Sequence, residues 1–404
     1  METKEGILPN YTYLIIGGGM TADAAVHGIR EIDRSGTIGL IGAEPHPPYN
    51  RPPLSKGLWK NQRLESIWRK SDDLGVTLHL GLRARHLDPG NKRVTDDQGS
   101  VYAFDKALLA TGATPRRLPF GAEQIIYFRT LDDYQRLRDL TERGRRFAII
   151  GGGFIGSEVA AALTMNAREV VMAFPEAGLC SRVFPADAVK FLNDLFRRKG
   201  VEILTAASVV GLEARHDKSI VKILDGQNEA ERDITVDGVV AGIGVQPNVE
   251  LAQEAGLEVQ NGIRVNASLR SSHPDIYAAG DVASFHNPAL DQWLRVEHED
   301  NANTMGRMAG RAMAGESIAY DHLPSFYSDL FELGYEAVGE VDSRLETVAD
   351  WKEPYREGVI YYLKAGRVRG VLLWNVWEQV DAARRLIAEP GPFRAADLKG
   401  RLPA

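Results

Sequence analysis

Cysteine is almost absent from the 404-residue chain, which contains only Cys180. A single cysteine excludes a disulfide framework, a cysteine-rich zinc or iron–sulfur site, and a mechanism that needs a redox pair of cysteines in one chain. We therefore expect Cys180 to be a structural thiol. Histidines and carboxylates are not grouped at metal-ligand spacing either, so we expect no metal site.

Long apolar segments and positive charge are also lacking. No apolar run reaches the roughly 20 residues that cross a bilayer, and residues 1–10 show no basic segment followed by an apolar one. The net charge of −7 argues against a dedicated nucleic-acid-binding protein, because such proteins usually carry a basic domain. The sequence predicts a cytoplasmic protein with no membrane span and no nucleic-acid partner.

The composition is that of an ordinary globular protein, with 44% hydrophobic and 25% charged residues. The length exceeds what one hydrophobic core supports, so we expect two or three domains. The chain has 40 glycines, and the places where they gather indicate how the domains are built.

A strand, a glycine turn, a helix and a second strand are predicted at the start of the chain. Residues 13–16 are apolar and run into Gly17–Gly19, which is typical of a buried parallel strand that ends in a tight turn. Apolar residues at helical spacing over 22–29 predict an amphipathic helix. A further apolar run over 37–41 ends close to Glu44, which completes a βαβ unit.

The same pattern recurs once. Residues 147–150 lead into Gly151–Gly153, an apolar helical stripe covers 155–163, and a strand over 170–174 ends close to Glu176. The two copies lie too far apart to be halves of one dinucleotide-binding domain, so each predicts a domain of its own.

Each glycine turn has a chemical use. Glycine lets the backbone approach a pyrophosphate, the helix behind it directs N–H groups at the phosphates, and the acid after the second strand accepts hydrogen bonds from a ribose. One such turn is weak evidence, because a glycine turn can also serve packing alone. Two turns in full context predict two dinucleotides, FAD and a nicotinamide nucleotide. The predicted contacts are Gly17, Gly19, Ala22 and Glu44 in the first unit and Gly151, Gly153, Gly156 and Glu176 in the second.

Glu176 bears on the choice between NADH and NADPH. A carboxylate at this place repels a 2′-phosphate, and no arginine occurs among residues 177–179. The sequence therefore predicts a preference for NADH.

Apolar runs at 108–113, 239–244 and 275–281 predict further strands. After about residue 320 we expect strands over 326–342, 358–365 and 368–377 and a closing helix over 381–388. The predicted fold class is α/β, with two Rossmann-like dinucleotide-binding domains and a smaller C-terminal α+β domain. The predicted boundaries are 1–115 with 245–320 for the FAD-binding domain, 116–244 for the NADH-binding domain and 321–404 for the C-terminal, interface-like domain.

Several motifs carry a family resemblance. Residues 49–56 resemble the signature of FAD-dependent ferredoxin and rubredoxin reductases, and Ala110–Gly112, Gly151–Glu158 and Ile276–Asp281 follow in the same order as in that family. This family belongs to the pyridine nucleotide-disulfide oxidoreductase superfamily, whose fold is of the glutathione-reductase type. Other stretches are similar to apoptosis-inducing factor: Ser55–Trp59, Phe174–Glu176, Arg295–His298, Ser328–Asp329, Gly334–Ala337 and Leu373–Asn375.

The resemblance implies an NADH-dependent flavoprotein reductase that transfers hydride to FAD and then electrons to a ferredoxin or rubredoxin. The alternative is an apoptosis-inducing-factor-like oxidoreductase or redox sensor whose acceptor is a quinone, dioxygen or another small molecule. The chain has Arg51–Leu54 where disulfide reductases of this superfamily carry a cysteine pair, so electrons would leave directly from the flavin edge. The sequence leaves open whether the protein is a monomer or a homodimer.

The resemblance also implies site residues. Lys56 and Glu158 would form an ion pair beside the flavin and Phe154 would stack on it, although taken alone they could be surface charges and a core aromatic. His298 could likewise be a structural histidine. Arg197–Lys199 could contact an acidic ferredoxin or be a solvated helix end. Further implied cofactor contacts are Arg51, Ala84, Thr111, Gly112, Arg129, Gly244, Gly280, Asp281, Glu297, His298 and Tyr327.

Overall fold

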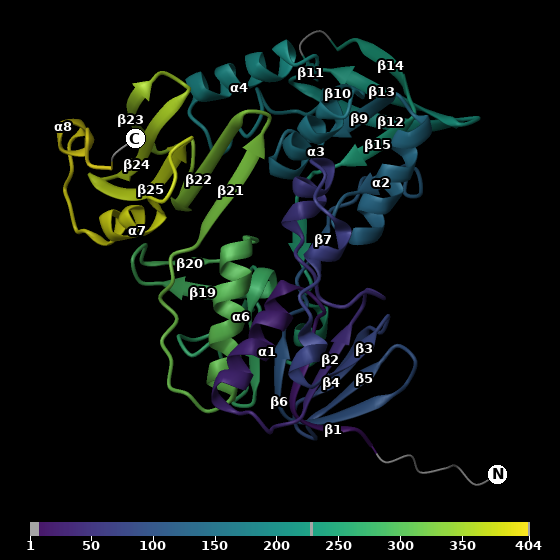
Figure 1. Ribbon diagram of the computed structural model, residues 1–404, viewed down its shortest axis with the longest axis vertical. Coiled ribbons are helices and arrows are strands. Elements are labelled where there is room, and N and C mark those ends of the chain that lie inside the picture. Colours follow the sequence, from purple (N-terminus) through teal and green to yellow (C-terminus); the bar gives the residue numbers. More distant parts are fainter. Residues whose placement is uncertain (1–7, 227–228, 403–404) are drawn as a thin grey trace. The chain divides into compact units, whose positions relative to one another are not determined.

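The computed structural model describes residues 8–226 and 229–402. The chain folds into two compact units, whose elements are labelled in Figure 1. The first unit comprises the residues up to Asn50, Glu65–Thr114 and Pro247–Pro324. The second comprises Arg51–Leu64, Pro115–Gln246 and the chain from Ser325 onward.

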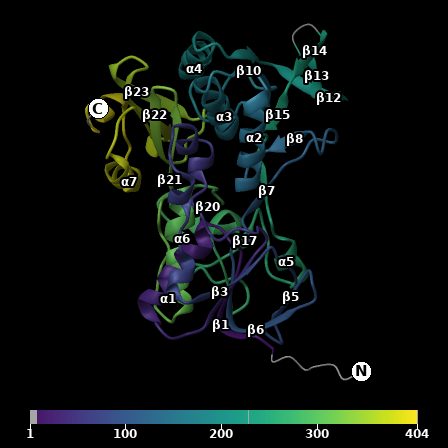
Figure 2. The ribbon, with the colours of Figure 1, turned by 45° about the vertical axis from the view of Figure 1, so that its right-hand side comes forward.

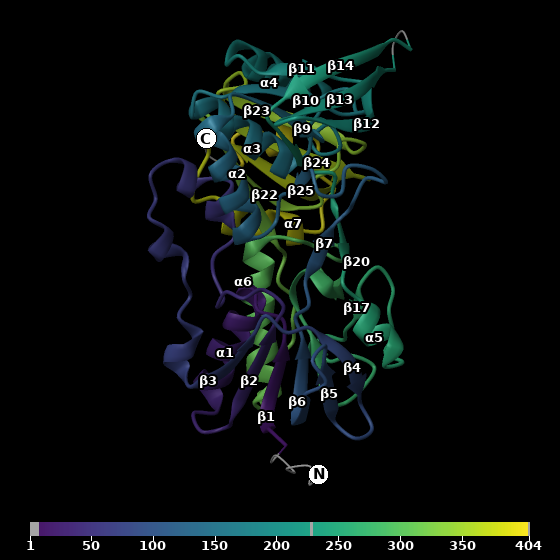
Figure 3. The same cartoon turned by 90° about the vertical axis from the view of Figure 1, so that its right-hand side faces the viewer.

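A seven-stranded sheet forms the centre of the first unit. Figure 3 shows its strands in the order β3-β2-β1-β6-β5-β4, and β18 pairs with β6. Strand β1 (Asn10–Ile16) pairs in parallel with β2 and β6, and it is buried along residues 13–16, as a central parallel strand requires. The other strands are β2 (Ile38–Gly42), β3 (Val76–Leu80), β4 (Ala84–Asp88), β5 (Arg93–Asp96), β6 (Val101–Leu109) and β18 (Ile276–Ala278).

Helices α1 (Met20–Ile32) and α6 (Glu299–Met313) lie side by side in this unit (Figure 2). Their backbones touch, because a Cβ atom on Gly310 would come within 2.1 Å of the carbonyl oxygen of Ala25. This close packing fixes the helix that follows the first glycine turn.

Smaller elements complete the first unit. Strands β17, β19 and β20 form a three-stranded sheet of this unit. Strands β7 and β16 pair as a two-stranded sheet, and they lie where the chain passes from one unit to the other. Their bounds, with those of the short helices, are β17 (Ile263–Arg264), β19 (Ala283–Asn287), β20 (Gln292–Leu294), β7 (Ala113–Pro115), β16 (Val245–Pro247), α5 (Glu250–Glu254), and 3₁₀ turns at Leu64–Ile67, Ser71–Leu74 and Gly280–Val282.

The second unit contains another parallel sheet, in the order β11-β10-β9-β15-β8. Helix α3 (Phe154–Met165) follows the second glycine turn, and α2 (Leu131–Arg143) begins with a capping box between Thr130 and Asp133. The remaining elements are β8 (Ile125–Tyr127), β9 (Arg146–Ile150), β10 (Glu169–Ala173), β11 (Glu202–Leu204), β15 (Gly238–Ala241), α4 (Ala186–Arg198), the antiparallel β12 (Ala207–Arg215), β13 (Lys218–Asp225) and β14 (Glu231–Val236), and 3₁₀ turns at Pro52–Leu54 and Gly57–Trp59.

An antiparallel sheet in the order β21-β22-β25-β24-β23 also belongs to the second unit. The run over 326–342, expected as strand, is a hairpin of β21 (Ser325–Leu330) and β22 (Leu333–Gly339). Strand β23 (Glu346–Glu353) was not predicted, because it is an edge strand of mostly polar, partly exposed residues. The other elements are β24 (Glu357–Lys364), β25 (Arg367–Trp374), α7 (Val380–Ala388) and α8 (Ala395–Leu398).

The seven-stranded sheet is mixed, with parallel pairing around β1 and antiparallel pairing of β4, β5 and β6. This sheet and the parallel five-stranded sheet, each with its glycine turn, together with the antiparallel sheet β21–β25 and its helices, confirm the predicted α/β class with a smaller α+β part. The three-domain boundaries stay a prediction. Among the residues described, no helix is long and apolar enough to cross a membrane.

Candidate functional site

The first glycine of the first turn is required by the protein itself. Gly17 has a φ of +135°, and a Cβ atom there would lie 2.0 Å from the carbonyl oxygen of Ala110, at the end of β6. Its N–H donates to the carbonyl of Ile41 at 2.8 Å, which ties the turn to β2. Any side chain at this position would force the sheet apart.

Gly19 differs, because no described residue requires a glycine there. Its φ of −97° and ψ of −168° are open to any residue, and a Cβ atom would meet no atom of residues 8–226 and 229–402 within 4 Å. No side chain caps the N-terminus of α1, which begins directly after Gly19. Open space beside uncapped helix N–H groups fits the pyrophosphate of a dinucleotide.

The second turn repeats this arrangement within the second unit. Gly151 has a φ of +107°, and its Cβ atom would lie 2.4 Å from the carbonyl oxygen of Gly242. Gly153 has a φ of −81° and open space around its Cβ direction. The structure therefore has two cradles of the same shape, and each fits a diphosphate.

The acids predicted to bind ribose each have a partner in their own unit. The hydroxyl of Tyr49 donates to Oε2 of Glu44 at 2.6 Å. Nη2 of Arg182 donates to Oε1 of Glu176 at 2.7 Å. Arg182 lies beyond the three residues that directly follow Glu176, and the loop turns back to bring its guanidinium to this carboxylate.

Glu158 is a buried carboxylate on α3 that receives three donors. Nζ of Lys56 lies 2.7 Å from Oε1 of Glu158. The Ser55 hydroxyl donates to Oε2 at 2.6 Å, and the Ser328 hydroxyl donates to Oε1 at 2.7 Å. Only 3% of the Glu158 side chain is exposed, so these three contacts replace the hydrogen bonds that water would otherwise provide. Both serines lie in stretches that resemble apoptosis-inducing factor, but no spacing in the sequence connects them with Glu158, because the elements that carry them meet only in the fold.

Aromatic rings lie next to this carboxylate network. Nζ of Lys56 lies 5.1 Å from the ring centre of Tyr327, and the Phe154 ring lies 5.0 Å from that of Phe326. Tyr327 is 39% exposed. The second unit thus brings together Lys56, Glu158, Phe154 and Tyr327.

In the first unit, Arg295 connects two of the predicted residues. Its Nη1 donates to the carbonyl of Asp281 at 3.1 Å and to Oε1 of Glu297 at 2.6 Å. Gly280 has a φ of +77°, and its Cβ atom would lie 2.3 Å from the hydroxyl of Thr21 in α1. The Gly280–Asp281 turn therefore lies beside the first turn of α1.

His298 directly precedes α6. Burial disfavours its charged ring and lowers its pKa to about 4, against the attraction of Asp281 and Asp300. The imidazole is therefore neutral at pH 7.

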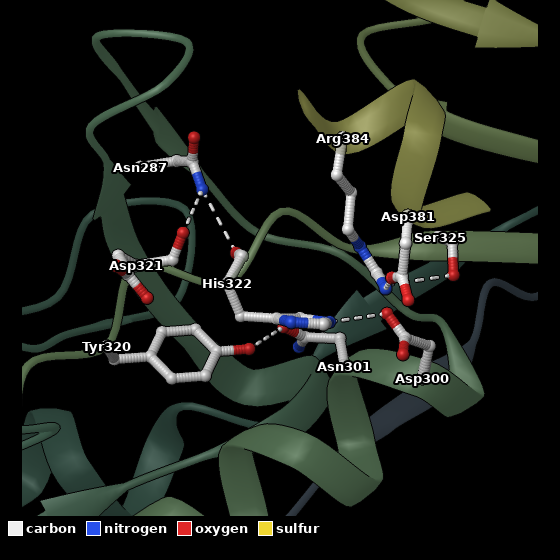
Figure 4. A network of polar contacts seen from close by, with 9 residues as sticks. All are labelled: Asn287, Asp300, Asn301, Tyr320, Asp321, His322, Ser325, Asp381 and Arg384. Carbon is white, nitrogen blue, oxygen red and sulfur yellow. Dashed lines mark hydrogen bonds and ion pairs between the residues drawn. The ribbon is translucent and has the colours of Figure 1, made fainter. Parts of the chain in front are cut away.

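The chain around α6 is fixed by a polar network of the first unit (Figure 4). Nε2 of His322 lies 2.6 Å from Oδ2 of Asp300, and the hydroxyl of Tyr320 donates to Asn301 at 2.8 Å. The amide of Asn287 donates to the carbonyl of His322 at 3.0 Å. These contacts hold the first turn of α6 and, with it, the end of the Glu297–His298 segment. Asn287 also donates to the carbonyl of Asp321, at 3.4 Å. Ser325, Asp381 and Arg384 belong to the second unit, where Arg384 donates to Asp381 and to Ser325.

The remaining predicted contacts lie in loops and at strand ends. In the first unit, the Thr111 hydroxyl and the Gly112 carbonyl are both bonded to Asn248. Ala84 lies at the start of β4, shortly after Gly81, whose N–H donates to the carbonyl of Glu44. In the second unit, Nη1 of Arg51 donates to the carbonyl of Arg129 at 2.9 Å. The backbone N–H of Arg116 donates to the carbonyl of Gly244.

Cys180 is buried, and burial raises the pKa of its thiol to about 12. Its reactivity is correspondingly low, which agrees with a structural thiol. Across 8–226 and 229–402 no group of three or more histidine, cysteine or acidic side chains could hold a metal ion.

Comparison with known proteins identifies the class. Residues 11–306 match the family described as "Pyridine nucleotide-disulphide oxidoreductase". Residues 309–354 and 349–389 match "Apoptosis-inducing factor, mitochondrion-associated, C-term". The chain belongs to the pyridine nucleotide-disulphide oxidoreductase family.

Individual relatives cover nearly the whole chain. It is 34% identical to the anthranilate 1,2-dioxygenase system ferredoxin–NAD(+) reductase component of Burkholderia cepacia, over 95% of this chain and 97% of that protein. It is 32% identical to apoptosis-inducing factor 1, mitochondrial, of Dictyostelium discoideum, over 95% of this chain and 79% of that protein. The solved covalent putidaredoxin reductase–putidaredoxin complex matches with a TM-score of 0.87 and 31% identity, over 95% of this chain and 94% of that one.

These matches support the resemblance stated from the motifs. They support a flavin-dependent NAD(P)H oxidoreductase with FAD and NAD(P)H as its cofactors. The two cradles fit these two dinucleotides.

Proposed function

We propose that the protein is an NADH-dependent FAD reductase that delivers electrons to a small iron–sulfur protein, a ferredoxin or a rubredoxin. The observation that carries the proposal is the pair of glycine turns, each with a glycine that faces open space at the N-terminus of a helix. It is supported by a relative of nearly equal length that is named as a ferredoxin–NAD(+) reductase component.

In this proposal each cradle binds one dinucleotide. Gly17, Gly19, Ala22 and Glu44 hold FAD, with Asp281 and the neutral His298 on the same unit. Gly151, Gly153, Gly156 and Glu176 hold NADH, and Glu176 provides the preference over NADPH. When bound, FAD accepts a hydride from NADH and releases electrons one at a time, which suits an iron–sulfur acceptor.

The protein's own contribution is charge and position. Glu158 holds the Lys56 ammonium in one orientation, and the hydroxyls of Ser55 and Ser328 fix the carboxylate in turn. A fixed cation next to a bound flavin favours the flavin's reduced, electron-rich form. Phe154 and Tyr327 present ring faces that can order a planar ligand.

The basic segment Arg197–Lys199 supplies no argument for an acceptor site. Arg197 lies 3.6 Å from Asp194, Lys199 lies 2.8 Å from Glu332, and Arg198 lies over the ring of Phe191. These contacts favour the alternative of an ordinary helix end.

The second candidate is an apoptosis-inducing-factor-like oxidoreductase or redox sensor with a quinone, dioxygen or other small-molecule acceptor. The match of residues 309–354 and 349–389 to the C-terminal region of that factor favours it. The two candidates differ in how fast the reduced protein loses its electrons, and to what.

The test uses the purified FAD-loaded protein. Anaerobic NADH should bleach the flavin absorbance, and reoxidation should be fastest with an oxidised ferredoxin or rubredoxin, measured by stopped flow beside a quinone and dioxygen. NADPH serves as the matched donor control. A flavin that NADH does not reduce would overturn the proposal, and faster reoxidation by a quinone or dioxygen would favour the second candidate.

A further inference from the structure

We propose that Arg182 is a specificity-determining residue of the second dinucleotide site, which weakens the exclusion of 2′-phosphorylated nucleotides that Glu176 would impose alone. This inference rests on the proposed function, because it concerns the nucleotide that the second cradle binds. The proposal predicts that the preference for NADH over NADPH depends on two opposing charges, the carboxylate of Glu176 and the guanidinium of Arg182.

The first step of the argument is the position of Glu176. It lies shortly after the end of β10, and its backbone carbonyl accepts a hydrogen bond from the N–H of Ala206 at 3.1 Å. The carboxylate is 29% exposed. A fixed backbone and an accessible carboxylate are what the ribose of a nucleotide on the adjacent glycine turn would require.

The second step is the backbone of Arg182, which is held on both sides. The N–H of Cys180 donates to the carbonyl of Gly152 at 2.8 Å, which joins this loop to the glycine turn itself. The N–H of Ser343 donates to the carbonyl of Arg182 at 3.0 Å. The loop is therefore anchored beside the cradle, and it does not need to be ordered by a ligand.

The third step is the side chain. The guanidinium of Arg182 is 85% exposed, and Nη2 lies 2.7 Å from Oε1 of Glu176. A guanidinium has five N–H donors and binds phosphate in a bidentate manner, so contact with one carboxylate oxygen leaves donors for a second anion. Exposed ion pairs of this kind are weak and exchange readily.

These charges act in opposite directions on a 2′-phosphate. Glu176 repels it, whereas Arg182 attracts it and partly neutralises Glu176. A 2′-hydroxyl needs the carboxylate as an acceptor and gains nothing comparable from the guanidinium. Removing either side chain should therefore shift the preference in a predictable direction.

The experiment measures binding of two nucleotide fragments to the FAD-loaded protein by calorimetry. The fragments are 5′-AMP and adenosine 2′,5′-bisphosphate, which differ only in the 2′-phosphate and cannot donate a hydride. In Arg182→Ala the ratio of bisphosphate to AMP affinity should fall about tenfold, and in Glu176→Ala it should rise at least about tenfold, since one charge-assisted contact is lost or freed. In the double variant the rise seen with Glu176→Ala should disappear.

Arg145 and Glu169 provide the matched control. They form an exposed ion pair at 2.9 Å in the same unit, at the opposite end of β10 from Glu176. Arg145→Ala and Glu169→Ala change the net charge equally and should leave the ratio unchanged.

Two contrary results are distinguishable. A bisphosphate affinity in Glu176→Ala that survives removal of Arg182 would overturn the role of the arginine while leaving the proposed function intact. If neither fragment binds to any variant and NADH does not reduce the flavin, the second cradle is no nucleotide site and the proposed function fails as well.

Discussion

The two glycine turns have nearly the same backbone but lie in different surroundings. In both, the first glycine of the turn (Gly17 or Gly151) has a positive φ, and its Cβ direction faces a carbonyl oxygen at the end of the neighbouring strand. The third residue of each turn (Gly19 or Gly153) faces open space. The fold therefore explains Gly17 and Gly151, whereas Gly19 and Gly153 are explained by the dinucleotides that we propose as ligands. Two glycines of one motif can thus have two unrelated physical roles.

The differences begin one helical turn further on. A Cβ atom on Gly156 would lie 2.1 Å from the carbonyl oxygen of Gly151, whereas the first unit accommodates Ala22 at the corresponding place. Helix α1 carries the buried Asp23, which is paired with Arg69, and α3 carries the buried Glu158, which is paired with Lys56. We interpret Asp23 as a structural carboxylate, whereas Glu158 is the carboxylate that our proposal places beside the flavin.

The largest effect is expected from the two buried carboxylates. Glu158→Ala should lower the free energy of unfolding by about 3–5 kcal/mol, because it leaves Lys56 without its counter-charge, and it should also slow flavin reduction by NADH. Asp23→Ala should destabilise to a similar degree but leave the reduction rate of FAD-loaded protein unchanged. Urea unfolding measures the free energy of unfolding, and stopped flow measures the rate of flavin reduction. If both variants slow flavin reduction equally, Glu158 and Asp23 do not differ in function.

Gly17→Ala should cost about 3 kcal/mol of unfolding free energy, because the residue combines a positive φ with a clash against backbone. Gly19→Ala should change the unfolding free energy by about 0.5 kcal/mol or less. Both are measured by urea unfolding of the FAD-free protein. Equal losses would contradict the division into fold-required and ligand-required glycines.

Valine at the ligand-facing positions should separate the two cofactors. Gly19→Val should leave the purified protein without FAD, while Gly153→Val should keep it yellow and raise the Kd for NADH at least about a hundredfold, since the branched side chain fills the phosphate space. Absorbance and calorimetry provide the readouts, and each variant is the control for the other. A yellow Gly19→Val protein would argue against the first cradle as the FAD site.

The smallest effect is expected at Cys180, next to the second turn. With its pKa raised to about 12 by burial, the thiol should stay protonated at pH 8 and should react with iodoacetamide only after unfolding, as followed by mass spectrometry. The first turn has no such neighbour, since Cys180 is the only cysteine. Rapid alkylation of the native protein would show that the loop beside the second turn opens.

Much of this fold could be predicted from the sequence, because the signals are local. A buried apolar strand, a glycine turn and an amphipathic stripe follow one another within about thirty residues, so β1, α1, β9 and α3 were all expected. The ribose-binding role of Glu44 and Glu176, each shortly after its second strand, stays a prediction. Strand β23 was not, because an exposed edge strand shows little apolar alternation.

The parts of the site that were missed depend on distant segments. Ser55 and Ser328 reach Glu158 from elements far apart in the chain, and no spacing rule connects them. Arg182 is close in sequence to Glu176, but the loop between them turns back at Cys180, which has a left-handed backbone with a φ of 53°. Such a turn is usually predicted from a glycine, and a cysteine at this position does not predict it. Strands and helices can be predicted from local patterns in the sequence, whereas contacts between side chains of distant segments become known only from the folded structure.

The single, inaccessible thiol has a practical consequence. Cysteines introduced one or two at a time at exposed positions would be the only groups to react with maleimide dyes or spin labels, so no cysteine-free background has to be made first. Pairs of such labels, one in each unit, would report distances in solution with and without nucleotide.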